Sequence, residues 1–145
     1  MTKHLVWGEI PFNRPRLVTG RYLLPSSFVA RSGMVPAALN HWRDNDHKFT
    51  AAVTWGVVEG GLMFYHVLDD EIPFEAGVLE RVKRGELYWS HGDGAAPEDT
   101  RRAIAAGEGR PVVYAERPLT GVTFSHASYV QESAFPQEPI RWVGF

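Results

Sequence analysis

The segment from residue 49 to residue 68 constrains the fold of this chain more than any other. Residues 49–58 are rich in β-branched and aromatic side chains, and every second position is apolar: Phe49, Ala51, Val53, Trp55 and Val57. Glu59-Gly60-Gly61 then supplies a turn, and Leu62, Phe64, His66 and Leu68 alternate again on the way back. Two runs of period-two alternation joined by a short glycine turn predict a β-hairpin. The fold must therefore contain an antiparallel sheet.

Further short strands are expected on both sides of this hairpin. Apolar and β-branched runs predict them at Leu5 to Ile10, Leu17 to Leu24, Val112 to Glu116, Gly121 to Ser125 and Ile140 to Phe145. The segment from Val35 to Trp42 stays ambiguous, because Pro36 is also compatible with the first turn of a short helix.

The clearest helix begins at Pro73. Its apolar stripe at helical spacing consists of Phe74, Val78, Leu79 and Val82. Lys83 and Arg84 fall in the last turn, and Gly85 ends the helix. A second short helix is expected from Pro97 to about Ala106. About seven strands and two or three short helices without regular β-α alternation favour one α+β domain, residues 1–145, with an antiparallel β-barrel-like core.

Composition limits the classes of function. The 145 residues carry a net charge of -2 with acids and bases interspersed, so no basic tract indicates a nucleic-acid partner. The chain has no cysteine, which excludes disulfides, thiolate zinc sites and a cysteine nucleophile. The first residues lack the apolar core of a signal peptide, and no apolar run has the length of a membrane helix. A cytoplasmic protein without a membrane partner is expected.

Ser90 and His41 are the first candidate pair for chemistry. Ser90 ends the apolar run that follows Gly85, and His41 closes the segment that begins at Val35. A hydroxyl nucleophile needs a base to take its proton, and histidine has a suitable pKa near neutrality. Each residue alone also fits a purely structural role, so the function depends on whether the two side chains meet.

Other chemistries fit the sequence less well. A small metal-dependent hydrolase would draw its ligands from His41, His47, His66 and His91. Their spacing matches no recognised zinc or His-Asp pattern, so neither a metal nor a cofactor is expected. The Gly-x-Ser-x-Gly elbow of α/β-hydrolases is absent, because Tyr88 and Gly92 stand two residues either side of Ser90.

Five segments follow one another in an order and spacing that resemble those of one protease family. Val35 to His41 is similar to the motif v-P-v-L-x-N-H, and the helix end, Gly85 and the run to Ser90 are similar to l-x-x-G-x-x-x-x-x-S-x-G. Shorter similarities are those of Leu24 to Phe28 with P-G-A-F, Glu59 to Leu62 with e-d-d-G-L, and Leu119 to Ala127 with L-x-E-V-S-L-V-x-x-P-A. Across roughly residues 22–134 the chain thus resembles the phage prohead proteases, which are capsid-maturation serine proteases related to herpesvirus assemblins.

This resemblance implies an assemblin-like fold and a serine endopeptidase with Ser90 as the nucleophile. His41 would accept the Ser90 proton during attack on the scissile carbonyl and then protonate the leaving amine. The third catalytic residue is left open, because a glycine replaces the family's glutamate; Glu116 is the first choice and His126 the second. A backbone N–H near the nucleophile, with Gly92 as the candidate, would stabilise the oxyanion.

The resemblance also implies partners. The substrate would be a scaffold protein, or the scaffolding segment of the major capsid protein, cleaved inside the assembling prohead in the host cytoplasm. Homodimers are common in this lineage, and the helix from Phe74 to Arg84 is one candidate contact. Trp89 and His91 depart from the family pattern around the serine. This departure keeps a non-catalytic phage head or β-barrel binding protein as the alternative.

Overall fold

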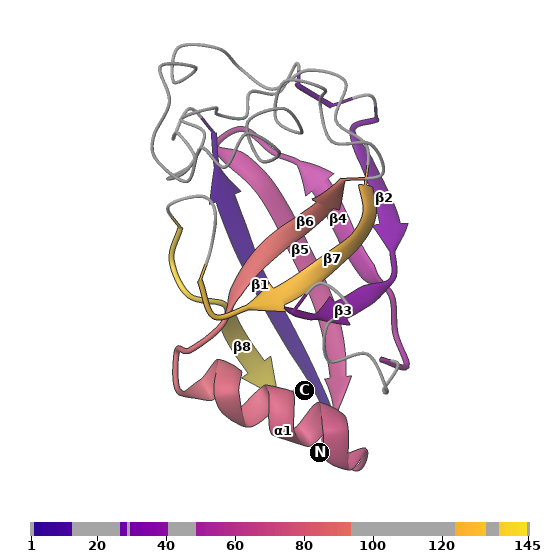
Figure 1. The fold of residues 1–145 in the computed structure, drawn as a ribbon, viewed down its shortest axis with the longest axis vertical. Helices are drawn as coiled ribbons and strands as arrows, with labels where there is room; N and C mark the ends of the chain where they lie inside the picture. Colours follow the sequence, from indigo (N-terminus) through magenta and orange to yellow (C-terminus); the bar gives the residue numbers. More distant parts are fainter. Residues whose placement is uncertain are drawn as a thin grey trace, which may run out of the picture.

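Two β-sheets and one α-helix make up the described part of the chain (Figure 1). The architecture comes from a computed structural model that describes residues 2–12, 27–28, 30–40, 49–93, 124–132 and 137–144. The smaller sheet lies across the larger one, and the helix covers one end of the pair (Figure 1).

The larger sheet is antiparallel throughout and has the strand order β2-β4-β5-β1-β8. Its strands are β1 (Lys3–Pro11), β2 (Ser32–Val35), β4 (Val53–Val57), β5 (Gly61–Asp69) and β8 (Arg141–Gly144). β4 and β5 form the predicted hairpin, although the first strand begins at Val53 and not at Phe49. The strands expected near both ends of the chain are observed as β1 and β8.

The smaller sheet has the order β3-β7-β6. Its strands are β3 (Ala37–Leu39), β6 (Tyr88–Asp93) and β7 (Phe124–Val130). β3 runs parallel to β7, and β6 runs antiparallel to it. Pro36 separates β2 from β3, and its carbonyl oxygen accepts a hydrogen bond of 3.0 Å from the Ala127 N–H. The chain therefore passes from one sheet to the other at Pro36, and the segment that was ambiguous in the sequence is extended up to Leu39.

Helix α1 (Pro73–Lys83) begins and ends where the sequence predicts. After the C-cap Arg84, Gly85 adopts a φ of 71°. The Gly85 N–H donates to the Val82 carbonyl at 2.9 Å, and the Glu86 N–H donates to the Arg81 carbonyl at 3.1 Å. These two bonds form a Schellman motif, which favours glycine at the left-handed position. Val78, Leu79 and Val82 are buried and Phe74 is partly buried against the core, so this helix face packs in the protein's own core.

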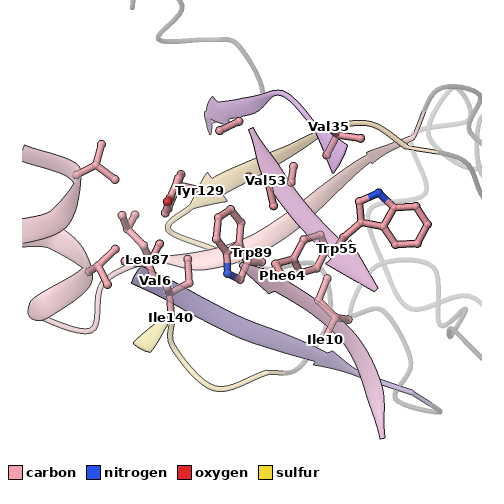
Figure 2. Close-up of a cluster of buried hydrophobic side chains, with 14 of the residues drawn as sticks. Val6, Ile10, Val35, Val53, Trp55, Phe64, Leu87, Trp89, Tyr129 and Ile140 are labelled. Atoms are coloured by element: carbon pink, nitrogen blue, oxygen red, sulfur yellow. The ribbon is translucent and has the colours of Figure 1, made fainter. Parts of the chain in front are cut away.

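The core lies between the two sheets, where aromatic side chains meet. The rings of Phe64 on β5 and Trp89 on β6 are stacked with centroids 5.4 Å apart, and Tyr129 on β7 lies 4.4 Å from Trp89 (Figure 2). Gly8 on β1 leaves room for the indole, because a Cβ at that position would lie 2.8 Å from Trp89 Cδ1. This packing fixes the position of β6 relative to the larger sheet.

The fold is mixed α+β, but the barrel-like core is a correction: the described strands form two separate sheets. Alternation in the sequence does not distinguish the two arrangements, because a barrel and a sandwich each bury one face of every strand. The strand expected at Gly121 to Ser125 is observed as β7, described from Phe124 and continuing to Val130. The expected strands at Leu17 to Leu24 and Val112 to Glu116, and the helix from Pro97, lie outside the described residues. Within the described ranges, no helix is long and apolar enough to span a bilayer.

Candidate functional site

Ser90 sits in the middle of β6, on the side of the smaller sheet that faces away from the core. Leu87 is fully buried and anchors the chain after the helix, and its carbonyl accepts a 2.9 Å hydrogen bond from the Ile140 N–H. Trp89 is fully buried and points into the core. Because successive side chains of a strand alternate between its faces, Ser90 lies on the outer face, where it is half-buried.

The strand register brings His126 to the same outer face. Ser90 is paired with Ser128 on β7, and Gly92 is paired with His126. Directly opposed residues share a face, so Ser90, Ser128 and His126 lie on one side of the sheet. Ser90 and His126 are diagonal neighbours across the two strands, a spacing that long side chains can bridge. Both side chains are half-buried, so part of each remains accessible to a substrate.

Ser128 was not singled out by the sequence, and its role is structural. Its side chain is fully buried, and its hydroxyl lies 3.3 Å from the carbonyl oxygens of both Ala38 on β3 and Tyr129. The hydroxyl can donate to either of them, and its bond to Ala38 ties β7 to β3. The alternation from His126 to Ser128 would have identified this residue, had the strand been predicted to extend beyond Ser125.

Gln137 is a second contributor that the sequence did not indicate. Its Oε1 accepts a 3.0 Å hydrogen bond from the Trp89 N–H, and its Nε2 donates a 2.9 Å bond to the Trp89 carbonyl. The amide thus pairs with Trp89 as a neighbouring strand would. No local pattern around Gln137 predicts this contact, because it joins residues far apart in the chain.

The Gln137 contact also shows how the backbone groups of β6 are directed. In an antiparallel pair, residues alternate between pointing both backbone groups toward one neighbour and toward the other. The backbone N–H and carbonyl of Trp89 point away from β7, toward Gln137. The backbone groups of Ser90 and Gly92 therefore point toward β7, and those of His91 point away from it. The alternation therefore favours the His91 N–H over that of Gly92 as the group available to an oxyanion.

The other candidate residues cannot be placed relative to Ser90. His41, His47 and Glu116 lie outside the described residues, as does the side chain of His91. Asn40, the residue before His41, follows β3 and has a φ of 52°. Asparagine tolerates this left-handed conformation better than most residues. β3, the strand that ends just before Asn40, is separated from β6 by β7.

His66 belongs to a buried network on the inner face. Its Nε2 lies 2.9 Å from the Ala51 carbonyl, so this nitrogen carries the proton and donates, while Nδ1 accepts from the Tyr129 hydroxyl. Burial lowers the pKa of His66 to about 4 and raises the pKa of Tyr129 well above its usual value. Both ring nitrogens of His66 are engaged, which leaves no lone pair for a metal. Across the described ranges, no group of three or more potential metal-ligating side chains occurs.

Glu75, in the first turn of α1, is fully buried. It accepts hydrogen bonds from the Thr50 N–H at 3.1 Å, the Thr50 hydroxyl at 2.9 Å and the Asp69 N–H at 3.0 Å. A buried carboxylate held by three donors at the start of a helix stabilises the packing of α1 on the sheet.

An apolar pocket of about 480 Å³ opens beside Phe49, at the corner where β2 leads into β3. Its walls are residues 34–37 and residues 49–52. The Phe49 ring stacks on Tyr129 with centroids 5.4 Å apart, which places this pocket on the core side of the smaller sheet. It is therefore separated from Ser90 by the sheet itself.

Comparison of the chain with protein-family models, with curated proteins and with solved structures finds no match.

Proposed function

We propose that this chain is a serine endopeptidase of the prohead type, with Ser90 as the nucleophile. The observation that carries the proposal is the placement of Ser90 and His126 as diagonal neighbours on one face of β6 and β7. Of the three histidines whose side chains the structure describes, His4 and His66 lie on the larger sheet, and His126 alone shares a face with Ser90. A catalytic triad gathers its third residue and its nucleophile around one imidazole, so the shared face suits His126 for the third place.

In the proposed mechanism, His41 takes the proton of the Ser90 hydroxyl while the oxygen attacks the scissile carbonyl. The tetrahedral intermediate then collapses, the carbon–nitrogen bond breaks, and the imidazolium gives its proton to the leaving amine. Water repeats the sequence on the acyl-enzyme and releases the second product. We assign His126, rather than Glu116, as the residue that orients His41, because its position relative to Ser90 follows from the strand register. The proposed oxyanion donor is the His91 N–H.

The proposed substrate is a scaffold protein, or the scaffolding segment of the major capsid protein, cut inside the assembling prohead in the host cytoplasm. Support for this part is the order of the motifs around His41 and Ser90. The proposed assemblin-like fold has the same support.

Co-expression with the scaffold or capsid protein proposed as the substrate tests the proposal. We expect Ser90→Ala to abolish scaffold cleavage and Ser32→Ala, an exposed serine on β2, to leave it unchanged. His126→Ala should slow cleavage by about 100-fold or more. Normal processing by Ser90→Ala would refute the protease, and normal processing by His126→Ala would return the third role to Glu116.

A non-catalytic head or binding protein is the second candidate, and the apolar pocket beside Phe49 favours it. A protein of this kind would keep its partner when Ser90 is replaced and lose it when the pocket is filled. Labelling of Ser90 by a fluorophosphonate, absent from Ser90→Ala, would decide for the enzyme.

A further inference from the structure

The face of the larger sheet that points away from the core is unusually apolar. On the central strands β1 and β5, the residues between the buried ones are Glu9 and five apolar residues, Leu5, Trp7, Met63, Tyr65 and Val67. An antiparallel sheet with one solvated face normally alternates apolar and polar residues. Here the middle of the two central strands is apolar on both faces apart from Glu9, and this is close to the pattern of strands covered on both sides. We call these five residues, with Lys3, Glu9, Asp69, Thr54, Met34, Arg141 and Val143, the outer sheet face.

Several side chains of the outer sheet face are well exposed in the isolated chain. The exposed fraction is 42% for Tyr65, 48% for Val143 and 69% for Met34. The Arg141 guanidinium lies 5.2 Å from the centre of the Trp7 ring. Tryptophan, tyrosine and arginine are the residues that most often dominate the energy of protein interfaces. The composition of this face therefore indicates a protein partner.

The outer sheet face also has an internal symmetry about the line between β1 and β5. The register pairs Lys3 with Asp69, Leu5 with Val67, and Trp7 with Tyr65. These three pairs are complementary: a cation with an anion, an aliphatic with an aliphatic, an aromatic with an aromatic. The fourth pair, Glu9 with Met63, does not match in kind, but it brings no like charges together. Consider a twofold axis that lies just above the outer sheet face and follows this line. It would place each residue of one copy over the residue of the second copy with which it is paired in the register, for example Trp7 over Tyr65. A self-complementary patch of this kind is what an isologous dimer requires.

We propose that the outer sheet face is the interface of a homodimer whose twofold axis runs parallel to the strands, between β1 and β5. Trp7 of each subunit then packs against Tyr65 of the partner subunit, and Leu5 against its Val67. Lys3, which bonds to Asp69 within its own chain at 3.0 Å, gains a second carboxylate across the interface. The two sheets would lie about 10 Å apart at an angle of about 30°, as in β-sandwiches.

The charges at the side of the face are compatible with this axis and not with the alternative one. Arg141 on β8 and Thr54 on β4 lie in the same row, on either side of Trp7 and Tyr65. The proposed axis places Arg141 over the neutral Thr54 of the partner subunit. An axis perpendicular to the strands and crossing this row would instead place Arg141 over Arg141. Charge complementarity thus selects the axis along the strands.

The size of the face sets the expected strength. Five strands spaced about 4.8 Å apart, over seven residues of about 3.3 Å each, cover roughly 550 Å² per subunit before side-chain relief is added. This area lies at the lower limit of stable interfaces. We therefore expect a dimer that dissociates on dilution through the micromolar range. Ser90 lies on the outer face of the smaller sheet, so the proposed dimer leaves it open, whereas the pocket beside Phe49 shares Met34 with the outer sheet face.

Sedimentation velocity over a concentration series tests the interface. We expect Tyr65→Arg to weaken the dimer by about 30-fold or more, as loss of a central aromatic does. Val58→Arg is the matched control, since Val58 at the β4–β5 turn has the same exposed fraction of 42%. A wild type that is monomeric at every concentration would overturn the proposal, as would equal effects of the two variants.

Thr54 provides a second test that does not depend on removing a large side chain. Thr54→Glu would face the partner's Arg141 and tighten the dimer roughly tenfold, counting both symmetric contacts, whereas Thr54→Arg would weaken it by a similar factor. Opposite signs are specific to this axis. Two effects of the same sign, with both variants folded by circular dichroism, would exclude it. A monomer that instead binds a head protein through Tyr65 would also refute the homodimer.

Discussion

Replacing Gln137 by glutamate is expected to make the attachment of β6 depend on pH. The amide of Gln137 both accepts from the Trp89 N–H and donates to the Trp89 carbonyl, at 3.0 and 2.9 Å. A protonated carboxyl group has the same two capacities, so it can make both bonds. An ionised carboxylate has only acceptors. It would keep the first bond and bring a negative oxygen against the carbonyl.

The magnitude follows from these two bonds. A net contribution of about 0.5–1.5 kcal/mol for each bond makes the pair worth roughly 1–3 kcal/mol in the free energy of unfolding. The folded protein favours the protonated form of the introduced glutamate, so its folded pKa lies above the unfolded value of about 4.3. The stabilisation is therefore fully present below the unfolded pKa and is lost as the pH rises through the folded pKa. At neutral pH, Gln137→Glu should cost about 1–3 kcal/mol, since one bond is lost and the carboxylate is held against the Trp89 carbonyl.

Urea unfolding of the wild type, Gln137→Glu and Gln137→Ala between about pH 5 and about pH 8 measures this effect. Subtracting the wild-type value at each pH removes the titration of other groups. Gln137→Ala should differ from the wild type by a constant amount, whereas the deficit of Gln137→Glu should grow with pH. A deficit of Gln137→Glu that does not change with pH would refute the two-bond account. Fluorophosphonate reactivity of Ser90, followed in parallel, reports whether the same attachment positions the nucleophile.

Three other positions give sharp expectations. A Cβ at Gly8 would lie 2.8 Å from Trp89 Cδ1, so Gly8→Ala should lower the free energy of unfolding in urea by about 1–3 kcal/mol, and an unchanged midpoint would contradict the packing. At Asn40, whose φ is 52°, Asn40→Val should cost about 1–2 kcal/mol in thermal unfolding and Asn40→Gly little, so equal losses would argue against the turn. His66 has a folded pKa of about 4 against 6.5 unfolded, so the unfolded chain binds more protons between these values. Stability should fall by about 3 kcal/mol as the pH drops through this window, and the non-titrating His66→Gln should flatten that slope.

The elements that the sequence predicted well are those whose signals are local. The hairpin at β4 and β5 follows from alternation and a glycine turn within one segment, and the end of α1 follows from Gly85. Both depend on residues that are neighbours in the chain. The described strands do not form the expected barrel-like core, because closure depends on which strands pair at the edges of the sheets, and that information is not local.

The candidate site shows the same division. Ser90 was selected because it ends the apolar run after a helix end, in a pattern that resembles a protease motif, and these features are local. Its relation to His126 depends on the register between β6 and β7, in which Ser90 pairs with Ser128. A shift of one residue would turn His126 to the inner face. Gln137 is further from prediction, since its two bonds to Trp89 join segments with no shared pattern.

By itself, the sequence determined the alternation within each strand and the stop of the helix, because these depend on the steric preferences of adjacent residues. Only the tertiary structure decided that β3, β7 and β6 form a separate sheet, and that Ser90 and His126 share its outer face. The burial of Trp89 against Phe64 and Gly8 sets that arrangement, since the packing of one aromatic ring between two sheets decides which face of β6 turns outward.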